Sequence, residues 1–218
     1  MAPRPIASRV SSFTRLTHGN RLLQLLVLGW AFPSFIQGVC GFGVPVAVSA
    51  PLLVGLGFNP IVAVVTALIG HSWAVTFGSL GSSYAVLVRL TDLDPTRLAT
   101  FGAFFLGLCC IIVGFCIAHY YAGWKGVKAS VPAVLWLSLP MAAVLNLMAN
   151  FVTPYIASFT AGMAGLLIGG LVVTRLPSYR PLEGTPAPAA ASSGEFHRAF
   201  SAYYIPIAVV FVVYLNQI

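Results

Sequence analysis

Three long stretches of the chain contain no Asp, Glu, Lys or Arg: residues 22–88, 98–124 and 129–174. The chain is 59% hydrophobic and only 7% charged, whereas a soluble domain carries about 25% charged residues. A soluble fold would lack the charges to cover its surface, and a disordered chain would be poor in apolar residues. Since a membrane helix needs ~20 apolar residues, the runs predict an all-α integral membrane protein with about six to seven hydrophobic segments.

Breaks and short polar loops divide these runs. We expect a first span at Arg21–Cys40, broken by Pro33, and further spans at 98–119, 131–151 and 155–174. Residues 41–80 are expected to form a helical hairpin with a turn at residues 58–60, because residues 44–57 would reach only about 21 Å as a helix, less than the ~30 Å hydrocarbon core. Its second arm is interrupted near Gly70, His71 and Ser72. The hairpin is either re-entrant or crosses the membrane twice.

Basic residues predict the organisation and orientation of the chain. Residues 1–21 are a basic N-terminal segment, 22–175 a transmembrane domain, 176–198 a linker rich in Pro, Ala and Ser, and 199–218 the start of a further transmembrane segment. With the N-terminal segment in the cytoplasm, nine of the eleven Lys and Arg residues fall on the cytoplasmic side, as expected for an inner-membrane protein. Because these residues sit at span ends and in loops, rather than in an aromatic-rich stripe, a nucleic-acid partner is not expected.

Helix breakers and small polar residues are concentrated between residues 37 and 83. Backbone that leaves helical geometry at membrane depth must be buried or line a cavity, and the N-termini of broken helices attract anions. We therefore expect a binding site for a small organic anion here. The candidate substrate-binding residues are Gln37, Gly41, Phe42, Gly43, Pro45, Ser49, His71, Ser72, Thr76, Gly78, Ser79, Gly81 and Ser82. The alternative is that the small residues only allow close helix packing.

His71 is the one side chain in residues 22–88 that titrates near neutral pH. An ionisable group inside a membrane is a functional candidate by default, so His71 is the expected proton relay. The alternative is a neutral histidine satisfied by Ser72 or by a backbone carbonyl. The four cysteines all lie in apolar runs without metal-ligand spacing, so we expect neither a metal site nor another cofactor.

Two stretches carry a family resemblance. Residues 35–60 read FIQGVCGFGVPVAVSAPLLVGLGFNP, and residues 74–81 read AVTFGSLG. Both closely resemble the signature of the L-lactate permease family, and a weaker likeness continues through GWKGVK at 123–128 and the following spans. The resemblance implies a symporter of the inner membrane that takes up lactate, glycolate or a similar 2-hydroxy monocarboxylate with protons, or with sodium as the alternative. It also implies a fold like one repeat of a two-repeat ion transporter.

The chain departs from the family pattern at three places. Many members have Glu where this chain has Gln37, Asn-Thr-Ala-Pro where it has His71-Ser-Trp-Ala, and Ile-Pro at Ser82-Ser83. The first departure argues against a Glu-based proton relay and leaves His71 as the substitute. Members are also much longer. This chain resembles their first half without the leading spans, so we expect a second repeat or a second copy to be needed.

Three functions remain after this reading. A transporter of small organic acids is favoured. A non-transporting remnant or assembly subunit of such a permease is the alternative. An intramembrane hydrolase, with Ser79 as nucleophile and His71 as base, is disfavoured because the spans offer no acid to orient the histidine. We therefore expect that the protein is not an enzyme.

Overall fold

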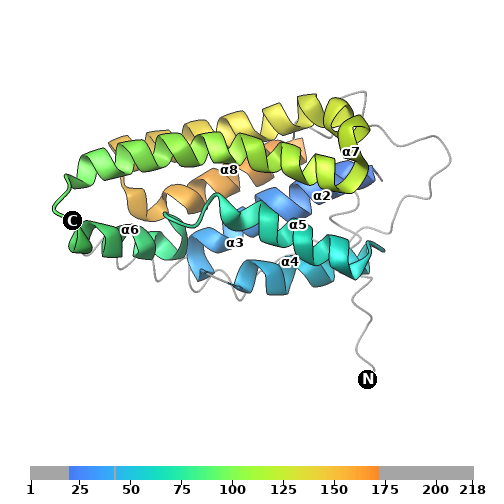
Figure 1. Cartoon of the computed structure of the whole chain (residues 1–218), viewed down its shortest axis with the longest axis horizontal. Coiled ribbons are helices and arrows are strands. Elements are labelled where there is room, and N and C mark those ends of the chain that lie inside the picture. Colours follow the sequence, from blue (N-terminus) through green and yellow to red (C-terminus); the bar gives the residue numbers. More distant parts are fainter. Residues whose placement is uncertain (1–19, 42, 172–218) are drawn as a thin grey trace, which may run out of the picture.

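The computed structural model describes residues 20–41 and 43–171, and all regular structure in this part of the chain is helical. Figure 1 shows the helices running along one common long axis. Phe42, the segment before residue 20, the linker and the last apolar run lie outside the described residues. The elements are α2 (Arg21–Leu26), η1 (Val27–Ala31), α3 (Phe32–Cys40), α4 (Val44–Gly55), α5 (Pro60–Ser72), α6 (Gly78–Leu90), α7 (Pro95–Phe151), η2 (Pro154–Ile156) and α8 (Ala157–Leu171).

The sequence predicts a break at Pro33, but in the structure the first span continues through this residue. Proline has no N–H to offer the carbonyl four residues earlier. The helix accommodates this by widening into the π-helical turn η1, where the Phe32 N–H bonds to the Val27 carbonyl. The helix then runs on to Cys40 and ends at Gly41, whose φ of 73° lies in the left-handed region open to glycine.

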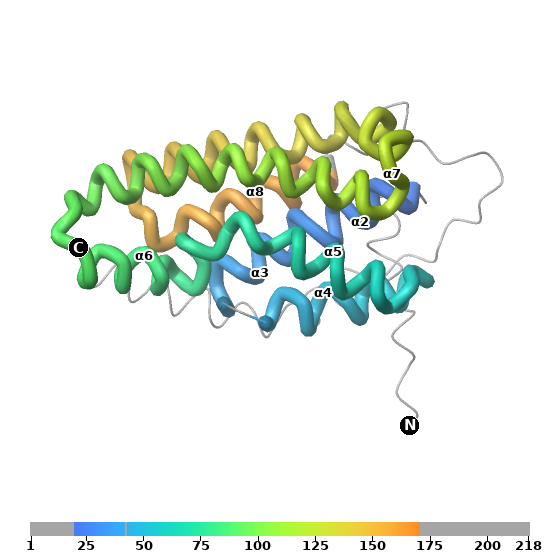
Figure 2. The backbone as a smooth tube through the Cα atoms, viewed as in Figure 1, coloured from blue at the N-terminus to red at the C-terminus, as the bar shows by residue number. Residues whose placement is uncertain are grey.

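The next two helices, α4 and α5, pack against each other as an antiparallel pair (Figure 2). Asn59 ends the turn between them, because its side chain accepts a hydrogen bond from the Ile61 N–H at 2.9 Å and caps α5. Arg21, at the start of the first span, donates to the carbonyls of Leu56 (2.7 Å) and Gly57 (2.9 Å). The start of α2 therefore lies beside this turn.

The chain breaks again between α5 and α6. After Ser72 it makes a turn over residues 73–77, and α6 begins at Gly78. The first turn of α6 is irregular, because Ser79, Leu80 and Gly81 have left-handed φ values of 47°, 56° and 67°. The chain thus crosses the length of the molecule from residue 60 to residue 90 as two helices with a break between them (Figure 2).

The sequence predicts two spans and a loop carrying Lys125 and Lys128, but in the structure these lysines are helical within α7. The chain still reverses, because Ala122 and Gly123 leave helical geometry and α7 folds back on itself (Figure 1). The Asn146 side chain joins the two limbs through a 3.1 Å hydrogen bond to the Ala103 carbonyl. Each limb is long enough to cross a ~30 Å hydrocarbon core.

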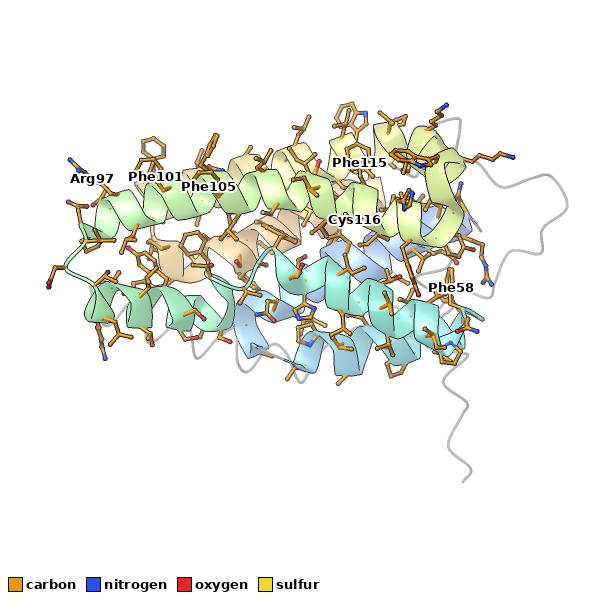
Figure 3. All side chains as sticks on the ribbon, in the orientation of Figure 1. Phe58, Arg97, Phe101, Phe105, Phe115 and Cys116 are labelled. Atoms are coloured by element: carbon orange, nitrogen blue, oxygen red, sulfur yellow. The ribbon has the colours of Figure 1, made fainter. Side chains whose placement is uncertain are left out.

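The distribution of side chains is that of a membrane protein. Large apolar side chains cover the outside of α7, as Figure 3 shows for Phe101, which is 61% exposed, and for Phe105. Polar side chains such as Ser34 and Gln37 are buried inside. Arg21–Cys40 and Pro95–Phe151 are long and apolar enough to span a membrane. The larger count of six to seven segments stays a prediction.

Candidate functional site

Two helices, α4 and α6, start partway along the molecule rather than at its ends (Figure 1). Their N-cap residues are Gly43 and Phe77, and neither start has a side-chain cap. The starts of α2, α5 and α7 are capped by Asn20, Asn59 and Asp94. An uncapped helix start leaves backbone N–H groups without intrahelical partners, and such groups bind anions. Among the described helices, these two interior starts therefore leave backbone N–H groups without a side-chain cap.

Gln37 from α3 lies against the start of α6. A Cβ at Gly78 would stand 2.7 Å from the Gln37 Nε2 atom and 3.1 Å from the Gln37 carbonyl oxygen, so glycine allows this close approach of α3 to α6. The Gln37 side chain is fully buried, and neither its Nε2 nor its Oε1 has a hydrogen-bond partner among the described residues. An amide in this state is costly unless a ligand or water completes its hydrogen bonds.

Gly41 and Ser79 form a second contact between the two breaks. A Cβ at Gly41 would collide with the Ser79 hydroxyl, so the α3–α4 junction and the α6 start touch directly. Ser79 and Leu80 hold left-handed backbone conformations that cost roughly 1–2 kcal/mol for each non-glycine residue. Gly81 packs against Tyr155, whose Cδ1 would lie 2.9 Å from a Cβ at this position. Strain of this kind is often stored at functional sites.

Two serines that the sequence analysis did not select hold the α5–α6 turn in place. The Ser34 hydroxyl accepts a hydrogen bond from the Trp73 indole at 2.9 Å, and the Ser158 hydroxyl donates to the Ala74 carbonyl at 2.9 Å. The sequence carries one signal for them. Ser34 lies four residues before Gly38, and Ser158 lies four residues before Gly162, which is the small-xxx-small spacing. That spacing marks close helix contacts, and here α3 and α8 pack with Gly38 against the backbone of Phe159.

His71 lies in the last turn of α5 and is 8% exposed. Its Nδ1 is 2.7 Å from the Ala67 carbonyl, which can only accept, so this nitrogen is assigned the proton. A backbone carbonyl therefore satisfies one ring nitrogen. The exposed hydroxyl of Ser72 bonds instead to the Ile69 carbonyl at 2.8 Å.

The remaining predicted residues surround these contacts. Pro45 and Ser49 are buried on α4, where the Ser49 hydroxyl has no partner in the part of the chain that the structure describes. Gly43 and Ser82 are exposed, and the carbonyl of half-buried Thr76 accepts from the Tyr84 N–H at 3.1 Å. The structure thus brings together Gln37, Gly41, Gly78 and Ser79. Within residues 20–41 and 43–171, no three His, Cys, Asp or Glu side chains gather in a metal-binding group.

Comparison with known protein families shows which family the chain belongs to. The family model for L-lactate permease matches residues 7–217 of the chain. The chain belongs to the L-lactate permease family. This confirms the resemblance read from residues 35–60 and 74–81, and it makes the chain a membrane protein.

Individual family members are similar over most of the chain. It is 33% identical to the L-lactate permease of Salmonella typhi and 30% identical to the glycolate permease GlcA of Escherichia coli (strain K12), in each case over 92% of this chain. It is 30% identical to the L-lactate permease of Halalkalibacterium halodurans over 88% of this chain. The chain spans only 38–39% of the length of these relatives. No solved structure matches it.

Proposed function

We propose that the protein carrying this chain is a secondary transporter that moves a small organic acid, such as lactate or glycolate, across the cytoplasmic membrane. The observation that carries the proposal is the contact of Gly41, which separates α3 from the uncapped start of α4, with Ser79 in the uncapped first turn of α6. Relatives named as lactate and glycolate permeases support the same class of substrate. A transporter needs no covalent chemistry, and the proposal assigns the chain no enzymatic role.

Backbone donors carry out the proposed binding of the acid. The first-turn N–H groups of α4 would receive the carboxylate, favoured by the partial positive charge at that helix start. The N–H groups of the left-handed turn at Ser79, Leu80 and Gly81 would assist, since successive N–H groups in such a turn can form an anion-binding concavity. The Ser79 hydroxyl and the Gln37 amide supply side-chain donors beside them. No Asp, Glu, Lys or Arg lies in residues 22–88, so the site would hold a single negative charge without a competing carboxylate.

Proton coupling is proposed to act through His71. Because Nδ1 is held by the Ala67 carbonyl, the proton would enter and leave at Nε2. The imidazolium would form on the same broken helix that leads to Gly78 and Ser79, so its charge would offset that of the bound acid. Sodium coupling is the rival, and it predicts uptake that follows the sodium gradient instead of pH.

The described residues form only one wall of the proposed site. Ser72 and Ser82 are exposed on either side of the break, and so is Gly43. Lipid cannot satisfy polar groups or irregular backbone at membrane depth, so protein or water must cover this face. We therefore propose that a second repeat of the native protein, or a second copy of this chain, completes the site.

The orientation is proposed from the two ends of the molecule. Arg97 lies at the α6–α7 end of the molecule (Figure 3), and Arg89 lies in the last turn of α6. Lys125 and Lys128 follow the reversal of α7 at Ala122 and Gly123, which lies at the opposite end (Figure 1). With Arg21 and these lysines in the cytoplasm of a bacterial cell, the basic residues follow the positive-inside rule.

The test is uptake by the native protein that carries this chain, purified and reconstituted in proteoliposomes. Accumulation of labelled lactate or glycolate under an imposed pH gradient, lost on adding a protonophore, is the expected result. Absence of uptake of any small organic acid would overturn the proposal in favour of a non-transporting subunit. Labelling of Ser79 by a fluorophosphonate probe would instead point to a hydrolase.

A further inference from the structure

We infer that the second limb of α7, which follows its reversal at Gly123, carries a binding site for an anionic phospholipid. The lipid phosphate lies at Lys125 and Lys128, and an acyl chain lies in an apolar groove at Leu135 and Leu139. This site is separate from the proposed site for the organic acid. It requires only that the chain lies in a membrane, which membership of the permease family gives.

The two lysines have no acidic partner among the described residues. Both side chains are exposed and lie directly after the reversal of α7. The acidic residues between residues 20 and 171 are Asp92 and Asp94, which lie between α6 and α7 at the opposite end of the molecule (Figure 1). The lysines therefore present two positive charges to an anion at the membrane surface.

Aromatic residues indicate the depth at which these lysines lie. Trp124 is 72% exposed and Tyr120 is 42% exposed, one on each side of the reversal. Tryptophan and tyrosine are enriched where the apolar core of a bilayer meets its headgroups. Lysine side chains at this level lay their methylene groups on apolar surface and extend the ammonium group toward the headgroups. The reversal is therefore at the depth of the lipid phosphates.

The lysines share one helix face with apolar residues deeper in the limb. This face comprises Lys125, Lys128, Pro132, Leu135 and Leu139, all of which are exposed. Successive members are three or four residues apart, which is the spacing of residues on one side of a helix. Because the helix is continuous from residue 124 to residue 151, the charged and apolar parts of the face point the same way.

An apolar groove lies on this face. It is lined by Leu135, Trp136, Leu139 and Pro140 and has a volume of about 260 Å³. It begins about 10 Å from Lys128 along the helix, at 1.5 Å per residue, toward the middle of the membrane. A phospholipid has its groups in the same order, with the phosphate at the surface and the acyl chains deeper. A zwitterionic lipid would bring its own cation to the lysines, so the charges favour an anionic one.

The experiment titrates the native protein that carries this chain, purified in a non-ionic detergent, with dioleoylphosphatidylglycerol or dioleoylphosphatidylcholine. Native mass spectrometry counts the bound lipids. The wild type is expected to bind the anionic phosphatidylglycerol more tightly. The double variant Lys125→Gln, Lys128→Gln should bind it about thirtyfold more weakly, since each lysine near an anionic lipid contributes about fivefold. Its affinity for phosphatidylcholine should change little.

Two matched controls separate this site from general effects. The double variant Arg89→Gln, Arg97→Gln removes the same charge from exposed residues near the opposite end, and it should keep the wild-type affinity for phosphatidylglycerol. Leu139→Trp fills the groove with a larger apolar side chain and should lower that affinity. Phe101→Trp changes an exposed apolar residue of the first limb, outside the groove, and should not.

The outcomes decide the inference without involving transport. Equal affinity for the two lipids overturns it, and so does an equal loss of affinity in the lysine and arginine double variants. Unchanged affinity in Leu139→Trp also overturns it, because the acyl chain would then lie elsewhere. If that variant does not fold, glycerol 3-phosphate decides. Binding of this soluble phosphate as tight as that of phosphatidylglycerol would show a site that reads only the phosphate and overturn the lipid assignment.

Discussion

At the scale of single residues, the α3–α4 junction depends on what surrounds two glycines. Gly41 and Gly43 have similar left-handed φ values of 73° and 88°. A Cβ at Gly41 would collide with Ser79, whereas a Cβ at Gly43 would meet no atom of the described residues within 4 Å, its chain neighbours aside. Backbone strain is therefore common to both positions, and the contact with the α6 start is specific to Gly41.

These two positions give a paired prediction. Gly41→Ala should abolish most acid uptake, because it adds a collision with Ser79 to the roughly 1–3 kcal/mol of strain in a backbone region that is essentially open to glycine only. Gly43→Ala introduces only the backbone strain of an alanine at positive φ, so it should lower the melting temperature and keep measurable uptake. Uptake and thermal unfolding of the two purified variants test this. Equal loss of uptake in both would show that strain alone matters and that the contact with Ser79 does not.

His71 carries the prediction for proton coupling. His71→Ala should lower uptake driven by a pH gradient by at least about tenfold, because it removes the proton-transfer group. Exchange of labelled for unlabelled lactate at equal pH needs no net proton movement and should continue. His119→Ala is the control, since that exposed histidine stacks edge-on against Trp124 with ring centroids 5.0 Å apart. If His71→Ala keeps the wild-type pH dependence of uptake, His71 has no part in proton coupling.

At the scale of elements, the helix starts fall into two groups. Those at the ends of the molecule are capped by side chains, as at α5 and α7. Those at the interior break, α4 and α6, are uncapped and adjoin residues with left-handed backbone. Capping stabilises a helix start by satisfying its N–H groups, and omitting a cap leaves those groups for a ligand. The difference separates structural helix ends from those that serve the proposed site.

The cap of α7 gives a prediction for pH dependence. The Arg97 backbone N–H donates to the Asp94 carboxylate at 3.0 Å and lowers the pKa of Asp94. A lowered folded-state pKa contributes stability above the unfolded-state pKa, and this contribution is lost as pH falls through the folded-state value.

Thermal unfolding of the protein in detergent between neutral and acidic pH checks this expectation. Asp94→Asn should keep a cap without a titrating group, so it should lose less stability on acidification than the wild type. Asp94→Ala should be less stable than the wild type at neutral pH. Identical acid sensitivity of wild type and Asp94→Asn would contradict the assignment.

At the scale of the whole molecule, charge and apolar surface are distributed by position along the long axis. Basic side chains lie at its ends, and apolar side chains such as Phe101 and Phe105 cover the length between them (Figure 3). This arrangement suits a bilayer, which accepts charges only at its two surfaces. It also makes the two ends distinguishable by experiment.

Cysteine labelling tests the proposed orientation. Arg97→Cys should react with a membrane-impermeant maleimide in bacterial cells whose outer membrane has been made permeable. Lys125→Cys should react only after the inner membrane is opened, because it lies at the opposite end, which we propose to be cytoplasmic. The unsubstituted protein measures the background from the four native cysteines. The reverse labelling pattern would show that the α6–α7 end faces the cytoplasm and would contradict the proposed orientation.

The amino-acid sequence alone was enough to assign the chain to membrane proteins, to predict helices and to name the family. Residue composition decides whether a segment is soluble in lipid, and glycine and proline act on the backbone where they stand, so such inferences need no knowledge of distant contacts. The same local logic failed at Pro33, where a π-helical turn absorbs the missing hydrogen bond, and at Lys125 and Lys128, which continue a helix.

Only the tertiary structure decided which of the candidate residues meet. Gln37 against Gly78, and Gly41 against Ser79, are contacts between residues about forty positions apart in the sequence. Ser34 and Ser158 support the α5–α6 turn from two other helices. These pairings depend on how whole helices pack. Packing is set by the joint shape of many side chains, and no local pattern in the sequence encodes it.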